Sequence, residues 1–175
     1  PKVSGELLRS GLIAIVLSLS AMLIYIWIRF EWQFSLGAII ALIHDVIITI
    51  GFFSILEFEI NLSIVAALLT IVGYSMNDTV VIFDRVRENL KKYSSKSINE
   101  ISNLSINETL SRTIITSLTT LLALLSIFFF GGKILQGFSF AMILGVIFGT
   151  YSSIFIANPI LMKLKVSQKS LLKED

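Results

Sequence analysis

The chain has 175 residues, 55% of them hydrophobic and 15% charged, and a mean hydropathy of +0.87. This balance is too apolar for a soluble domain of this size and predicts an all-α polytopic membrane helix bundle. The formal net charge of +2 is spread over short clusters, which argues against a nucleic-acid partner. With no cysteine and one histidine, the chain lacks the usual ligands of a zinc site, so no metal or other cofactor is expected.

Five segments are long and apolar enough to cross a hydrocarbon core of about 30 Å, which takes about 20 residues at 1.5 Å each. They are residues 8–28, 36–56, 62–83, 113–130 and 138–162. The short EFEIN turn makes the second and third segments antiparallel neighbours. The polar stretch 84–111 is expected to be a solvated loop with a short helix. No Ser/Gly linker divides the chain, so 1–175 is predicted to be a single transmembrane domain.

The distribution of basic residues predicts the orientation, because short cytoplasmic connections are enriched in Lys and Arg. With the N-terminus outside, ten of the 14 basic residues lie inside and three outside, and Arg112 is set apart because it lies at the mouth of a span. The inside set is Arg29, Arg85, Arg87, Lys91, Lys92, Lys96, Lys163, Lys165, Lys169 and Lys173, and the outside set is Lys2, Arg9 and Lys133. We therefore expect the N-terminus outside, the C-terminus inside and, since there is no initiator Met, a preceding part of the protein.

The stretch GYSMNDTVVIFDRVREN, residues 73–89, contains a carboxylate inside a membrane-length apolar run. Burying Asp78 in hydrocarbon costs several kcal/mol unless it is paired, protonated or facing water. Asn77 and Asp78 lie on one side of the third segment, and Arg112 and Thr116 share a side of the fourth. We expect these polar sides to face each other, so that the Arg112 guanidinium reaches Asp78.

Opening and closing of such a pair could load and unload a proton. One proton moving through about 100 mV supplies about 2.3 kcal/mol, which is enough to bias two conformations. The alternative is a structural ion pair that only fixes helix register. Asp45, next to His44 in the second segment, shares a face with Thr49. It either completes a polar network or lies solvated near the membrane surface.

Two further patterns have simple structural readings. Asp84, Arg85, Arg87 and Glu88 are interpreted as interfacial anchors with contacts inside their own helix. The small residues of GVIFG, 145–149, give the last segment a face for close helix packing.

Residues 73–89 closely resemble the signature of the SecF family of bacterial protein-export membrane proteins. The match continues in order through RFEW (29–32), ALIHDVIITIGFF (41–53), NETLSRTIITSLTTLL (107–122) and GTYSSIFIANPIL (149–161). The resemblance covers nearly the whole chain. It implies the last five of the six transmembrane helices of an RND-like unit, without the periplasmic domain that the family carries between its first two helices.

The resemblance also implies a function. Members of this family pair with SecD, associate with the SecYEG channel, and use proton influx to help preproteins leave the membrane on its outer side. The chain would thus be a proton-driven transport subunit of the bacterial cytoplasmic membrane and not an enzyme, with protons as its coupling ion and preprotein and the lipid bilayer as further partners.

The same resemblance assigns roles to single residues. The proton-path residues of the family fall on Asp78 and Arg112, and Asn77 and Thr79 are expected to orient the carboxylate. The chain departs from the family pattern at NETL, where the family has NQTL. The added Glu108 lies one turn before Arg112 and could compete for its guanidinium.

Two other functions are compatible with parts of this pattern. One is an RND-type exporter of lipids or small molecules, which would use the same kind of proton path. The other is an intramembrane aspartyl protease, because Asp45 and Asp78 lie on adjacent segments and two carboxyl groups can share a proton. The HD and ND contexts of these residues differ from the YD and GxGD motifs expected of such proteases.

Overall fold

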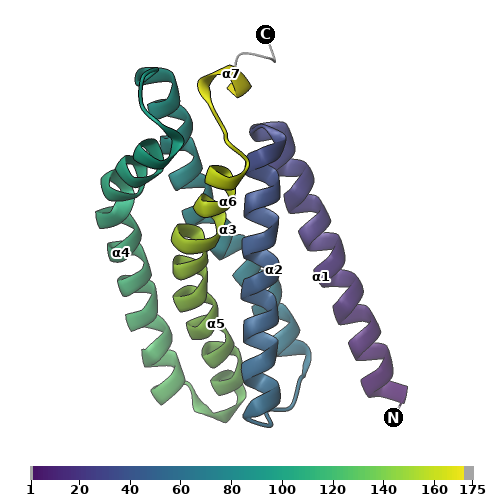
Figure 1. Ribbon diagram of the computed structural model, residues 1–175. Helices are drawn as coiled ribbons and strands as arrows, with labels where there is room; N and C mark the ends of the chain where they lie inside the picture. The colour runs from purple at the N-terminus through teal and green to yellow at the C-terminus, as the bar shows by residue number, and fades with distance from the viewer. Residues whose placement is uncertain (1, 172–175) are drawn as a thin grey trace.

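The computed structural model describes residues 2–171, which form a bundle of long helices (Figure 1). The elements are α1 (Lys2–Arg29), α2 (Trp32–Ile55), α3 (Leu62–Lys92), α4 (Ile98–Phe130), α5 (Gly132–Ser152), a π-helical turn η1 (Ser153–Ala157), α6 (Asn158–Lys163) and α7 (Gln168–Leu171). There is no strand between residues 2 and 171. The prediction of an all-α fold is confirmed.

Five helical stretches are long and apolar enough to span a membrane. They are Gly5–Arg29, Trp32–Ile55, Leu62–Lys92, Ile98–Phe130 and Gly132–Lys163. The last of these runs without a break through α5, η1 and α6. The predicted segments lie within these helices, except that α2 ends one residue before Leu56.

Helix α5 is the central element, packed against α2, α3 and α4, whereas α1 contacts α2 and α3 from the outside (Figure 1). Its approach to α3 depends on two glycines. A Cβ at Gly145 would collide with the side chain of Ile71, and one at Gly149 would lie 3.1 Å from Cβ of Ser75. The GVIFG pattern therefore does provide the close-packing face, and it brings α5 against the polar part of α3.

The polar stretch 84–111 is helical apart from a short turn, so the prediction of a loop there was wrong. Helix α3 continues to Lys92, and α4 begins directly after Ser97. Ser97 and Glu100 form a capping box, in which the Glu100 amide donates to Ser97 Oγ (3.3 Å) and the Ser97 amide donates to Glu100 Oε2 (2.8 Å). The prediction failed because a segment defined by its apolar residues stops at the first charged ones. The helices themselves continue into the polar region, where a cap stabilises the start of α4.

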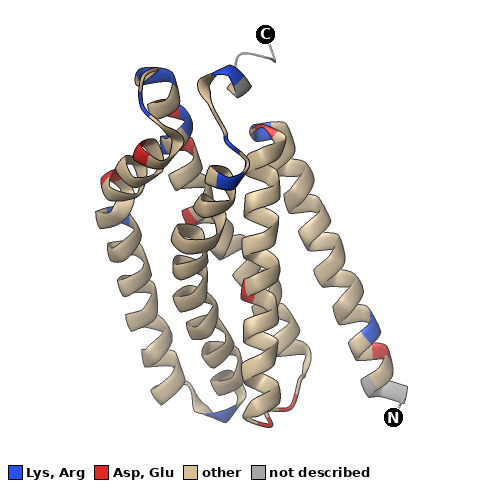
Figure 2. Ribbon diagram, in the orientation of Figure 1, with Lys and Arg blue, Asp and Glu red and all other residues tan. Residues whose placement is uncertain are grey.

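Lysines and arginines gather at one end of the bundle, as Figure 2 shows. This end, called the basic end below, carries the α1–α2 turn, the α3–α4 turn and the segment after α5. Lys133 lies at the opposite end, in the first turn of α5. The side chain of Lys2 and the whole of Lys173 lie outside the described residues. The assignment of the basic end to the cytoplasm remains a prediction.

Candidate functional site

Asp45 of α2 is a fully buried carboxylate, with 0% of its surface exposed. Ser75 of α3 donates a hydrogen bond to its Oδ2 (2.6 Å), and Ser152 of α5 donates to the same oxygen (2.8 Å). His44 Nδ1 lies 3.0 Å from Oδ1. Asp45 therefore joins α2, α3 and α5 in a polar network, and of the two readings of the sequence the solvated one was wrong.

Asp78 of α3 is also buried, with 4% of its surface exposed, but it has weaker partners. Thr150 Oγ1 of α5 lies 3.5 Å from Asp78 Oδ2, which is long for a hydrogen bond between oxygens. The same hydroxyl is 2.8 Å from the Val146 carbonyl and 2.7 Å from Ser117 Oγ of α4. Because these are nearer partners, the capacity of Asp78 to accept hydrogen bonds is largely unused.

Arg112 does not form the expected ion pair with Asp78. It makes no ion pair with any residue between 2 and 171, although it is close enough to act on Asp78 electrostatically. Asp78 turns towards Thr150 on α5, whereas the exposed Arg112 lines a cavity of about 430 Å³ between α3 and α4 at the basic end. The polar sides of α3 and α4 thus belong to neighbouring helices, but the charged groups of Asp78 and Arg112 stay apart in this conformation.

The neighbours of Asp78 in the sequence do not touch its carboxylate. Thr79 Oγ1 lies 2.9 Å from Ser153 Oγ and donates to the Ser75 carbonyl (3.3 Å). Asn77 is exposed and lines a separate open cavity of about 470 Å³ between α1 and α3. Neither side chain forms a hydrogen bond to Asp78 within the described residues, so the expectation that they orient this carboxylate stays a prediction. The Thr79 side chain instead joins α3 to the π-helical turn.

Thr116 lies one turn after Arg112 on α4 and is half-buried. Its carbonyl accepts hydrogen bonds from the hydroxyls of Thr119 (3.0 Å) and Thr120 (2.8 Å). Thr120 in turn accepts a hydrogen bond from the Tyr74 hydroxyl of α3 (3.3 Å). Thr116 thus supports a polar contact between α3 and α4 through its backbone.

The last turn of α5 and the first residue of η1 carry most of the site residues that sequence reasoning missed. Thr150 contacts Asp78, Ser152 contacts Asp45, and Ser153 contacts Thr79. The signal in the sequence is the run GTYSSIF inside an apolar segment. That signal is weak, because a Ser or Thr in a helix commonly bonds to its own backbone and nothing in the sequence distinguishes a bridging hydroxyl.

Helix α5 continues directly into η1, a π-helical segment. Pro159 has no N–H with which to continue the helical ladder, and the Asn158 side-chain amide instead donates to the Ser153 carbonyl (3.2 Å). Asn158 is fully buried, and its Oδ1 has no partner in the described residues. Such π-turns are frequent at functional sites, and this one lies directly after the hydroxyls that reach both carboxylates.

The two buried carboxylates are held by different hydroxyls, and no contact between them occurs within the described residues. An aspartyl protease needs two carboxyl groups close enough to share one proton. The arrangement therefore does not resemble a protease dyad. No group of three or more His, Asp and Glu side chains that could hold a metal ion is found in the described part of the chain.

Ion pairs at the basic end connect helices, which corrects the reading of those charges as anchors within one helix. Arg29 pairs with Asp84 (3.1 Å), and the buried Glu31 pairs with Arg87 (3.0 Å). Both pairs fasten the α1–α2 turn to α3. Of these four charges, only Arg85 and Glu88 pair within their own helix in the described part of the chain (2.8 Å).

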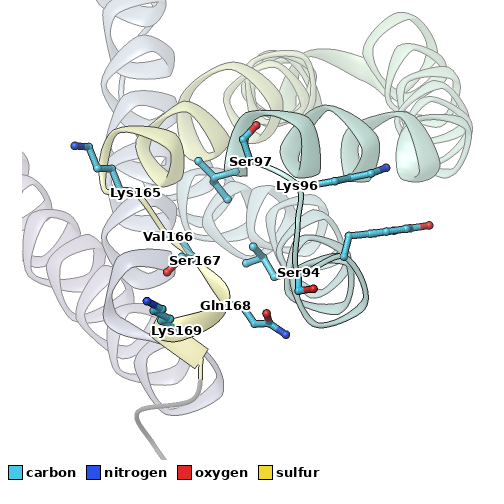
Figure 3. Close-up of a pocket in the computed structure, with 11 residues that line it drawn as sticks. Ser94, Lys96, Ser97, Lys165, Val166, Ser167, Gln168 and Lys169 are labelled. Atoms are coloured by element: carbon cyan, nitrogen blue, oxygen red, sulfur yellow. The ribbon is translucent and has the colours of Figure 1, made fainter.

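A second cavity at the basic end, of about 350 Å³, lies between the α3–α4 turn and residues 165–169 (Figure 3). Lys96 and Lys165 point away from each other there, and Lys96 lies over the Tyr93 ring, 4.3 Å from its centroid. These amino groups do not converge on a common point, so the cavity adds nothing to the buried polar network.

Comparison with known proteins places this architecture. Residues 1–167 match the family described as "Protein export membrane protein SecD/SecF, C-terminal". The chain belongs to this family. The resemblance seen in the sequence motifs is thereby confirmed.

Two curated relatives of this SecD/SecF chain are named protein translocase subunit SecF. The one from Cereibacter sphaeroides is 54% identical over 168 residues, covering 96% of this chain and 52% of the relative. The one from Rickettsia bellii is 58% identical over 161 residues, covering 92% of this chain and 53% of the relative. The chain thus spans about half the length of these relatives.

Solved structures agree with the family assignment. The crystal structure of SecDF from Thermus thermophilus, described as a translocon-associated membrane protein, superposes with a TM-score of 0.90 at 44% identity. The match covers 94% of this chain and 23% of that one. SecDF in a super-membrane-facing form gives a TM-score of 0.85 at 45% identity. With its five apolar helices, this SecD/SecF chain is a multi-pass membrane protein.

Proposed function

We propose that the chain is the membrane part of a proton-driven accessory subunit of the Sec protein translocase. Its partners would be SecD, the SecYEG channel and the emerging preprotein, in the cytoplasmic membrane of a bacterium. Membership of the SecD/SecF family and the names of the relatives support this assignment. The basic end faces the cytoplasm in this proposal, and the N-terminus of the chain lies on the periplasmic side.

The proposal that the subunit is proton-driven rests on one observation, a buried carboxylate that accepts few hydrogen bonds. Asp78 lies in a membrane-length helix, is 4% exposed, and has one hydroxyl contact at 3.5 Å. A charge in that position is costly unless a partner approaches, and Arg112 is the nearby cation. Asp78 is thus suited to alternate between a protonated form and a form paired with Arg112.

The proton cycle would act on the bundle through α5. Any change in the charge of Asp78 alters its contact with Thr150, and Ser152 on the same turn is bonded to Asp45. A proton crossing about 100 mV contributes about 2.3 kcal/mol, roughly a fifty-fold shift between two conformations. Movement of this turn would therefore pass from α3 to α2 within one cycle.

Replacing the carboxylate of Asp78 tests the proposal. Asp78→Asn keeps the size of the side chain but cannot release a proton at physiological pH, so we expect it to abolish proton-dependent stimulation of preprotein export. Export by membrane vesicles is measured with and without a proton gradient, and membrane insertion is checked in parallel. Asp84→Asn is the matched control, since that carboxylate lies on the same helix in an exposed pair with Arg29. Full stimulation in Asp78→Asn would overturn the proposal.

A further inference from the structure

The cavity between α3 and α4 lies between Asp78 and the basic end of the bundle. Two of its lining residues, Val81 and Arg85, come three and seven positions after Asp78 and therefore share its side of α3. Glu108 and Arg112 line it from α4. With a volume of about 430 Å³, the cavity provides a polar space between the buried carboxylate and the end of the bundle.

One carboxylate oxygen holds the two helices together across this cavity. Glu108 Oε2 of α4 accepts a hydrogen bond from Arg85 Nε (2.6 Å) and another from Asn89 Nδ2 (2.8 Å), both from α3. Arg85 also donates to Glu88 (2.8 Å), but that contact stays within α3. Among the described residues, Glu108 is thus the carboxylate that joins α3 to α4 across the cavity. We call its contacts with Arg85 and Asn89 the Glu108 clasp.

Arg112 is placed to compete for the same carboxylate. It follows Glu108 by four residues, which is the favourable order for a Glu–Arg pair on a helix. Arg112 forms no ion pair within the described part of the chain, and Glu108 Oε1 accepts no hydrogen bond there. Arg112 is therefore near enough to act on the buried Asp78, and it shares the cavity wall with Glu108 and with the α3 carboxylates Asp84 and Glu88, which are engaged by Arg29 and Arg85.

We propose that Glu108 is a positioning residue of the proton relay, and that exchange of Arg112 between Asp78 and Glu108 opens and closes the cavity at the basic end. This inference rests on the proposed function. When Asp78 is charged it attracts Arg112, and the Glu108 clasp holds α3 against α4. When Asp78 is protonated, Arg112 turns to Glu108 and weakens the clasp. Water then enters the cavity and accepts the proton, and the recharged Asp78 draws Arg112 back.

A single thiol in the cavity reports whether the clasp is closed. The chain has no cysteine, so in a full protein whose remaining part is also made free of cysteine, Val81→Cys introduces one reactive group on the cavity wall. Its rate of reaction with a water-soluble maleimide is measured on the full protein in permeabilised membranes. Glu108→Gln removes the charge that binds Arg85, and we expect at least a three-fold faster reaction. Glu88→Gln is the matched control, because that carboxylate binds Arg85 without joining two helices, and its rate should equal that of the parent.

The exchange of Arg112 is tested by a double-mutant cycle on the same thiol. Asp78→Asn should speed the reaction, because Arg112 is left with Glu108 alone, and adding Arg112→Ala should remove that increase. Additive effects of the two substitutions would contradict the exchange. The pair Arg85→Glu with Glu108→Arg should restore the parent rate, which guards against a folding defect in one variant. An unchanged rate in Glu108→Gln overturns the clasp. Since labelling does not depend on export, normal export by Asp78→Asn would defeat the proposed function while leaving this result interpretable.

Discussion

At the level of single residues, the two buried aspartates differ in how completely they are satisfied. Asp45 accepts short hydrogen bonds from Ser75 and Ser152, whereas Asp78 has one contact at 3.5 Å. A carboxylate with strong donors on two other helices is suited to fix their positions. A carboxylate without them can change partners at less cost, which is why the relay is assigned to Asp78 and a structural part to Asp45.

Removal of the Ser152 hydroxyl tests this structural part. Ser152→Ala leaves the buried Asp45 short of a donor, and loss of a hydrogen bond to a charged group costs about 1.5–3 kcal/mol. We expect a lower Tm of the purified protein in detergent. Ser139→Ala is the matched control, because Ser139 is equally buried on α5 but bonds only to carbonyls of its own helix. Equal Tm losses in the two variants would argue against a bridging role.

The sequence identified the charged members of the site but not the hydroxyls. Asp78, Arg112 and Asp45 stand out because an ionisable group in an apolar run is expensive wherever it points. Thr150 and Ser152 do not stand out, since a hydroxyl can be satisfied by its own helix at almost any position. The direct Asp78–Arg112 pair also failed to appear, because helix periodicity places two residues on facing sides without fixing their rotamers.

At the level of helices, the contact between α3 and α5 determines which hydroxyls reach the carboxylates. The glycines at 145 and 149 let α5 approach Ile71 and Ser75, and the turn after Gly149 then lies against Asp45 and Asp78. The GVIFG spacing predicted close packing but not its partner helix. The extension of α3 and α4 beyond the apolar segments was missed, because ion pairs and a capping box stabilise those turns instead of lipid contact.

Enlarging Gly145 tests the importance of this contact. A Cβ there would collide with Ile71, so Gly145→Ala should separate α5 from α3 and lower the Tm, despite the higher helix propensity of Ala. Gly51→Ala on α2 is the matched control, since a Cβ there meets nothing within 4 Å. That variant should keep or raise the Tm, because Ala is favoured over Gly in a helix by up to about 1 kcal/mol. A Gly145→Ala protein as stable as Gly51→Ala would show that α5 can shift without loss.

For the whole molecule, the charge distribution and the relay depend on the same orientation. The basic end contains the cavity between α3 and α4, the Glu108 clasp and the two ion pairs that fasten the α1–α2 turn to α3. If that end faces the cytoplasm, the cavity is on the side to which protons flow. The opposite end, with few basic residues, would then face the periplasm, where the preprotein emerges.

Cysteine accessibility tests this orientation without altering any charge. Ser95→Cys places a thiol in the exposed α3–α4 turn, and Gln136→Cys places one at the start of α5, at the opposite end. In intact spheroplasts a membrane-impermeant maleimide should label Gln136→Cys and not Ser95→Cys, and permeabilised spheroplasts should show both labelled. The reverse pattern would put the basic end outside. Protons entering from the periplasm would then meet the Glu108 cavity before Asp78, and the clasp would control proton entry instead of release.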